Sequence, residues 1–147
     1  MSSPALTWLL VRKHHSQLET QKLGRATAVM SREAGNLTGR HSFKFSGLAD
    51  RRTVDIQEAT GKRGGIVLTK SRASRGAARR PATRLAAQTM TKDFRRVARA
   101  VAAACDGYRN DLKGAALARW TKIAQNQRAA RRGGRTPKSR GARKTQA

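Results

Sequence analysis

The sequence is poor in cysteine, aromatic residues and long apolar runs, and each shortage excludes a class of protein. Its single cysteine, Cys105, cannot form an internal disulfide and offers no metal-site spacing, which fits a reducing compartment. Aromatic side chains make up only 4% of the 147 residues, so we expect one small domain with an aliphatic core. The apolar stretch at residues 5–11 is too short for a membrane span and lacks the preceding positive charge of a signal peptide.

Groups of residues that could perform catalysis are missing as well. The three histidines, His14, His15 and His41, all lie in polar sequence, and none belongs to a convincing nucleophile–base arrangement. Side chains of adjacent residues diverge, and no acidic or cysteine cluster is near enough to complete a metal site with the first two histidines. Residues 61–65 (GKRGG) lack the spacing of a phosphate-binding loop, and hairpin turns are rich in glycine anyway. We therefore predict that the protein is not an enzyme and uses no cofactor, no metal and no small-molecule substrate.

The sequence is also poor in acidic residues, and this shortage indicates an anionic binding partner. Lysine and arginine number 33 against 8 aspartates and glutamates, which gives a formal net charge of +25. The acidic residues end at Asp111, and the 36 residues beyond it hold eleven cationic side chains. A compact protein with this imbalance repels itself and needs a polyanion for neutralisation, so nucleic acid is the expected partner. Acidic proteins and anionic membranes are weaker alternatives.

The type of nucleic acid follows from the kind of cation and from missing DNA-binding motifs. Arginine predominates, and its planar guanidinium suits phosphate contacts and stacking on exposed bases. A DNA-compacting protein would share the charge, but the sequence contains no helix-turn-helix, zinc finger or heptad zipper. A folded body with basic arms that order on binding is typical of a protein buried in folded RNA.

The central segment, residues 36–68, predicts a small antiparallel sheet. Phe43 and Phe45 alternate with polar residues, which predicts a half-buried strand over 42–46. Val54 and Ile56 share one face of a second strand, and a glycine-rich turn leads to a β-branched run at 66–68 that can pair back. We expect the cationic positions of this segment to form an RNA-facing edge of the sheet.

Three helices are expected around this sheet. Ser3 and Pro4 form a helix start, followed by a short apolar helix to residue 11 whose Trp8 we expect to pack on the sheet. Apolar residues recur at helical spacing over 94–105 and again from residue 110 to 127. The short connection between the last two helices predicts an αα-hairpin.

The remaining segments are polar or basic. Residues 14–21 have the pattern of an edge strand, whereas residues 24–35 look like a loop. Residues 70–91 are read as a basic extended segment that orders along phosphates, with a flexible linker as the alternative. The fold class is therefore α+β, with one RNA-binding domain over residues 1–127 and a basic tail over 128–147 that is disordered when unbound.

The candidate RNA-binding residues are the clustered cations along the whole chain. They are Arg12, Lys13, Arg40, Lys44, Arg51, Arg52, Arg72, Arg75, Arg79, Arg80, Arg84, Arg95, Arg96, Arg99, Arg109, Arg119, Arg128, Arg131, Arg132 and Arg135.

The order of segments resembles the eukaryotic large-subunit (60S) ribosomal protein family numbered twenty-eight. The matching residues are Trp8, Val11-Arg12, Asn36-Leu37, Arg40, Ser42-Phe43, Gly47-Leu48, Arg52-Thr53-Val54, Gly65 to Leu68, Pro81-Ala82-Thr83 and Tyr108 to Leu112, with Ala115, Ala116 and Arg119 after them. The resemblance covers roughly residues 6–127. It departs from the family's pattern over residues 76–91 outside Pro-Ala-Thr, so RNA contacts there transfer least.

The resemblance implies a non-catalytic component of the cytosolic large ribosomal subunit. It implies binding to ribosomal RNA and to neighbouring ribosomal proteins, no role at a membrane, and passage through the nucleolus during assembly. A nucleolar ribosome-assembly factor with a similar domain is the alternative, although such factors carry long charged extensions that this chain lacks.

Overall fold

A computed structural model describes residues 3–61, 64–72 and 85–133 of the chain. Its centre is an antiparallel sheet of three strands in the order β3-β4-β5, formed by Val54–Glu58, Ile66–Ser71 and Leu85–Met90. The hairpin of β3 and β4 confirms the expected pairing of the two β-branched runs. The strand β5 lies within the segment that we expected to be an extended RNA-binding arm, so part of that segment belongs to the sheet.

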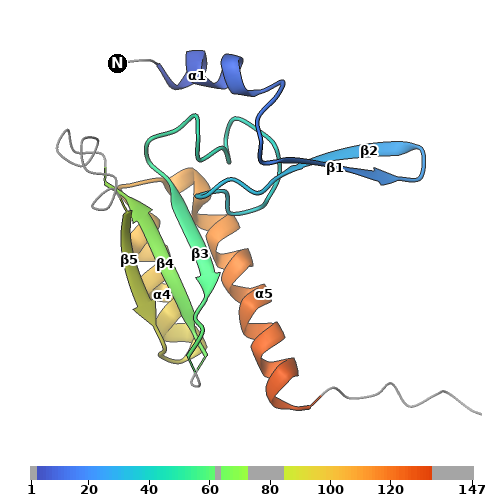
Figure 1. Ribbon diagram of the computed structural model, residues 1–147. Coiled ribbons are helices and arrows are strands. Elements are labelled where there is room, and N and C mark those ends of the chain that lie inside the picture. The colour runs from blue at the N-terminus through green and yellow to red at the C-terminus, as the bar shows by residue number, and fades with distance from the viewer. Residues whose placement is uncertain (1–2, 62–63, 73–84, 134–147) are drawn as a thin grey trace, which may run out of the picture.

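Two helices cover one face of the three-stranded sheet, and the opposite face carries none of the described helices (Figure 1). The helix α4 spans Phe94–Cys105, and a short 3-10 turn at Asn110–Leu112 leads into α5, Lys113–Arg131. Gly107 adopts a φ of 71° in the connection, a conformation that glycine reaches without a steric penalty. The αα-hairpin is therefore confirmed.

The core lies between these helices and the sheet. Ile56 and Leu68 project from neighbouring strands and are almost fully buried, as are Val101 and Cys105 of α4. These residues share the helix-facing side because apolar residues recur every second position in the strands and every third or fourth in α4. Trp120 of α5 closes the core. Its indole stacks on Phe94 at 5.4 Å between ring centroids, and Nε1 donates to the Phe94 carbonyl at 3.2 Å.

The N-terminal part is a separate arrangement. The helix α1, Pro4–Val11, starts as expected, because the Ser3 hydroxyl accepts a hydrogen bond from the backbone N–H of Leu6. The strands β1 (Leu18–Leu23) and β2 (Ala26–Ser31) form their own antiparallel hairpin, which projects sideways from the body (Figure 1). The chain therefore has two small sheets rather than one, within the expected α+β class.

Four expectations about local structure are wrong. Residues 42–46 form turns instead of a strand, because the backbone N–H groups of Phe45 and Ser46 bond to the carbonyl of Ser42 nearby. Residues 24–35 contain the whole of β2 and are not simply a loop. Trp8 does not reach the sheet and packs on the loop that carries Phe43.

The fourth error concerns the end of the fold. Residues 128–131, assigned to the disordered tail, continue α5 without a break. The side chain of Gln127 explains this extension, since it bonds to both the N–H and the carbonyl of Gly65 in the β3–β4 turn. None of the helices in the described ranges is long and apolar enough to span a membrane.

Candidate nucleic-acid interface

The loop between β2 and β3, residues 32–53, carries four of the candidate RNA-binding cations on a polar framework. Asn36 is buried and its side chain bonds four times: Oδ1 accepts from the amides of Thr38 and Gly39, and Nδ2 donates to the Arg40 carbonyl and to Glu33. These bonds replace the strand ladder that the segment lacks. They fix the backbone from which Arg40 projects into solvent.

Glu33 holds the second half of this loop. Its buried carboxylate accepts hydrogen bonds from the Ser46 hydroxyl at 3.0 Å and from the backbone N–H of Leu48 at 3.4 Å. Gly47 lies so close to the Ala34 carbonyl that any Cβ at this position would overlap it. The side chain of Glu33 thus stabilises the loop from inside and does not contribute an acidic group to the surface.

The helix α1 is attached to the same loop through aromatic rings. Trp8 lies 4.9 Å from the ring of His41 and 6.0 Å from that of Phe43, measured between centroids. His41 Nε2 donates to the Arg12 carbonyl at 2.8 Å. This docking brings Arg12 and Lys13, both exposed, to the same part of the molecule as the loop cations.

Arg109 has a different role from the one expected. All five N–H groups of its guanidinium have partners inside the protein: the carboxylates of Asp50 and Asp111 and the carbonyls of Lys44 and Arg52. The hydrogen bond to Asp111 raises the pKa of Arg109 and lowers the pKa of Asp111. Arg109 therefore ties the loop to the α4–α5 connection, and we leave it out of the interface.

The helix α4 presents a second cationic surface. Arg95, Arg96 and Arg99 are exposed, while Val97 and Val101 of the same helix are buried. The separation follows from helical periodicity, as the sequence predicted. Within the described ranges these three arginines form no ion pair with a carboxylate.

A third cationic surface lies where α4 begins and α5 ends. A hollow of about 250 Å³ is lined there by Lys92, Phe94, Arg128 and Arg131, together with Asp93. The guanidinium of Arg128 lies over the Phe94 ring, 5.5 Å from its centroid, which restrains it without neutralising it. Arg132 follows at the end of the helix, and Arg119 donates weakly to the Ile56 carbonyl at 3.4 Å.

The family model for the ribosomal L28e protein family matches residues 6–126. The chain belongs to this family. Among curated relatives, the "Large ribosomal subunit protein eL28" of Dictyostelium discoideum is 29% identical over 130 residues, which covers 88% of this chain and 92% of that protein. The resemblance drawn from the sequence is confirmed.

The family match covers almost all of the described structure. It begins in α1 at residue 6 and ends near the last turns of α5 at residue 126, so it includes the polar loop and the arginines of α4, whereas Arg128, Arg131 and Arg132 lie beyond it.

RNA binding by the expected cations stays a prediction, and the described ranges give positions for only part of the set. Arg72 follows β4 and is exposed, whereas Arg75, Arg79, Arg80, Arg84 and Arg135 lie outside the described residues. Lys22 and Arg25 were missed. They are exposed at the tip of the β1–β2 hairpin, and the signal for them was Gly24, a turn residue between two runs of equal length.

Proposed function

We propose that the chain is a structural, non-catalytic constituent of the cytosolic large ribosomal subunit that binds and stabilises folded ribosomal RNA. Membership of the ribosomal L28e family carries this proposal, and the name of the Dictyostelium relative supports the assignment to the large subunit. Ribosomal RNA and neighbouring ribosomal proteins are the partners, and the protein passes through the nucleolus during assembly.

The distribution of charge supports RNA binding through phosphates. Carboxylates at Glu33, Asp50 and Asp111 are engaged within the fold, while cations at the polar loop and on α4 face outward. Contacts from arginine and lysine to phosphates position a protein on RNA without reading sequence. Cations on several sides of a small body suit a protein that contacts more than one RNA segment.

Fractionation of ribosomes on a sucrose gradient tests the assignment to the subunit. We expect the tagged full-length protein in mature large subunits and in polysomes. Its absence from both would overturn the proposal. Confinement to nucleolar precursor particles would support the alternative, an assembly factor that leaves before the subunit matures.

The salt dependence of binding tests the phosphate contacts. The triple variant R95Q/R96Q/R99Q should bind a 20-base-pair RNA duplex with a slope of log K against log[salt] that is shallower by about 2–3, because up to three phosphate contacts are lost. The matched control is E19Q/R32Q. It removes an exposed ion pair in which Arg32 is already neutralised, at 2.7 Å, so the slope should not change.

An equal slope for the triple variant and the parent protein would show that α4 does not contact phosphates. Gradient fractionation of the same variant then distinguishes the assignment to the large subunit from the contact of α4 with phosphates. Normal incorporation with an unchanged slope would leave the subunit assignment standing and would remove α4 from the interface.

A further inference from the structure

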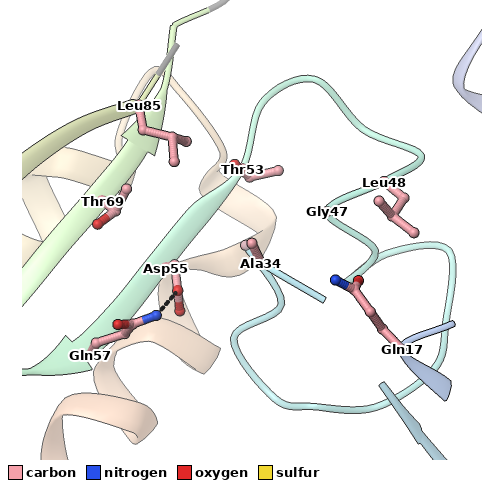
Figure 2. A pocket seen from close by; sticks show the side chains of 10 residues that line it. Gln17, Ala34, Gly47, Leu48, Thr53, Asp55, Gln57, Thr69 and Leu85 are labelled. Carbon is pink, nitrogen blue, oxygen red and sulfur yellow. Dashed lines mark hydrogen bonds between the residues drawn. The ribbon is translucent and has the colours of Figure 1, made fainter. Parts of the chain in front are cut away.

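A cleft lies on the face of the three-stranded sheet that the described helices leave uncovered. It has a volume of about 610 Å³, within the range of small-ligand sites. The sheet contributes Asp55, Gln57 and Thr69, and the polar loop supplies the opposite wall, including Gly47 and Leu48 (Figure 2). None of the exposed cations named above, on the polar loop, on α4 or at the end of α5, lines this cleft.

The lining is unsuited to a phosphate. The described residues that line it include no lysine or arginine, and the one charged side chain among them is the carboxylate of Asp55. A carboxylate repels a phosphate and attracts hydrogen-bond donors. The chemistry of this cleft therefore differs from that of the cationic surfaces described above.

The carboxylate is held in a fixed orientation. Asp55 Oδ1 accepts from the backbone N–H of Ile56 at 2.8 Å, and Oδ2 accepts from Gln57 Nε2 at 2.9 Å. Each carboxylate oxygen can accept a further hydrogen bond, and Figure 2 shows the Asp55–Gln57 pair at the sheet side of the cleft. Thr69 lies directly opposite Asp55 in the strand register and adds a hydroxyl.

Two leucines give the cleft apolar walls. Leu48 on the loop is 44% exposed and Leu85 on β5 is 51% exposed, although both are large apolar side chains. Figure 2 places them on different sides of the cleft. Apolar walls with a fixed pair of acceptors suit a flat ring that carries adjacent donors on one edge.

We propose that this cleft takes an unpaired guanine base of the bound RNA, with Asp55 accepting hydrogen bonds from its Watson–Crick edge. Guanine presents two adjacent donors there, N1–H and the 2-amino group. Adenine, cytosine and uracil each place an acceptor next to their donor, which would face a carboxylate lone pair. Arg52 lies two residues before β3 and Arg72 directly follows β4, and both strands line the cleft. Both arginines are exposed, so they are available to phosphates next to an inserted base.

This inference deepens the proposed function and rests on it. It assigns one site of base readout to a protein whose other contacts are to the RNA backbone. Readout of splayed single-stranded bases on their Watson–Crick edge is how sequence-specific RNA recognition is usually achieved.

The test uses the full-length protein and single-stranded 11-mers of uridine that carry one central guanosine or one central inosine. Inosine lacks the 2-amino group and is otherwise the same purine ring. Fluorescence anisotropy at low salt should show the guanosine oligomer binding at least about fivefold more tightly than the inosine oligomer. In Asp55→Asn this ratio should fall to about one, because the amide presents a donor where the carboxylate presented an acceptor.

Two further variants make the test specific. Glu58→Gln removes the same charge from an exposed position at the end of β3, outside the cleft, and should keep the ratio of the parent protein. Leu48→Ser removes an exposed wall and should lower guanosine binding several-fold while the slope against salt stays unchanged.

The outcomes separate the two proposals. Equal binding of both oligomers by the parent protein, with normal salt dependence, would overturn the guanine site and leave RNA binding intact. A ratio that survives Asp55→Asn would also overturn it. Failure to bind any oligomer or duplex at low salt would contradict the proposed function itself. If free arginine displaced the oligomers and the protein showed no preference between guanosine and inosine, the cleft would take a cationic side chain instead of a base.

Discussion

The two halves of the described chain are held together by different interactions. From β3 onward, apolar side chains of the sheet, α4 and α5 form a continuous buried cluster. Of the side chains described between residues 3 and 53, most of the buried ones are polar, such as Ser31, Glu33 and Asn36. Leu37 is the exception that joins the hydrophobic cluster, as one fully buried side chain. The helix α1 buries none of its residues and exposes Leu9 and Leu10.

The difference indicates which half contributes most of the free energy of folding. Burial of apolar surface is the dominant favourable term in folding, whereas a hydrogen bond contributes only about 0.5–1.5 kcal/mol net. The C-terminal half is therefore the stable scaffold. The N-terminal half, which carries Arg12, Lys13 and Arg40, is anchored to this scaffold by Leu37 and otherwise depends on a few polar contacts. It gains further stability when a ligand binds it.

The largest effect is expected from breaking the scaffold at Trp120. Trp120→Ala removes a buried indole, its stacking on Phe94 and the bond from Nε1 to the Phe94 carbonyl. The free energy of unfolding should fall by about 3–5 kcal/mol. Urea denaturation followed by circular dichroism measures this change.

The control for Trp120 is Leu10→Ala in the other half. Leu10 is equally apolar but 73% exposed, so the free energy of unfolding should change by less than about 0.5 kcal/mol. Comparable losses in the two variants would mean that α1 packs into a core, which would contradict the division drawn between the halves.

A smaller and local effect is expected from Asn36→Ala in the polar loop. The substitution leaves the amides of Thr38 and Gly39 without their acceptor and removes the bond to Glu33. Each unsatisfied buried group costs about 1–3 kcal/mol, so these two amides should exchange with solvent at least about tenfold faster. Hydrogen exchange followed by NMR resolves them individually.

The C-terminal half supplies the reference for that measurement. Amides of Val101 and Cys105 in α4 should keep their exchange rates in Asn36→Ala, because the loop opens without unfolding the core. Equal acceleration in both halves would show a single cooperative unit. The matched variant Asn126→Ala, at an exposed position of α5, should leave both sets of amides unchanged.

The same division explains how far the sequence could predict the fold. The helix α4 and the strands β3 and β4 were predicted because their apolar residues, such as Val97 and Ile56, follow a period that only a buried face requires. Phe43 and Phe45 show the same alternation over five residues, but they form turns. The Ser42 carbonyl closes the turns, and Glu33, which lies outside any local pattern, accepts a hydrogen bond from the Ser46 hydroxyl.

The candidate site likewise has parts that the sequence could predict and parts that it could not. The outward arginines of α4 were predictable, because an apolar stripe fixes which positions of a helix face solvent. The role of Arg109 was not, because its partners Asp50 and Asp111 lie 59 and 2 residues away and come together only in the folded chain. The cleft beside Asp55 likewise depends on the approach of the loop at Leu48 to the sheet.

The smallest effect concerns the ion pair between Arg109 and Asp111, and it depends on pH. The hydrogen bond from Arg109 lowers the pKa of Asp111, so the folded protein holds fewer protons than the unfolded chain near the usual pKa of about 3.9. The pair therefore stabilises the fold fully above that pH and loses its contribution as pH falls through the lowered pKa. Because Asp111 is exposed, the contribution should be less than about 1 kcal/mol. Urea unfolding at pH 7 and pH 3 should show that Asp111→Asn loses less stability on acidification than the parent protein. An equal loss in Asp111→Asn and the parent would show that the hydrogen bond from Arg109 does not stabilise the charged form of Asp111 in the folded protein.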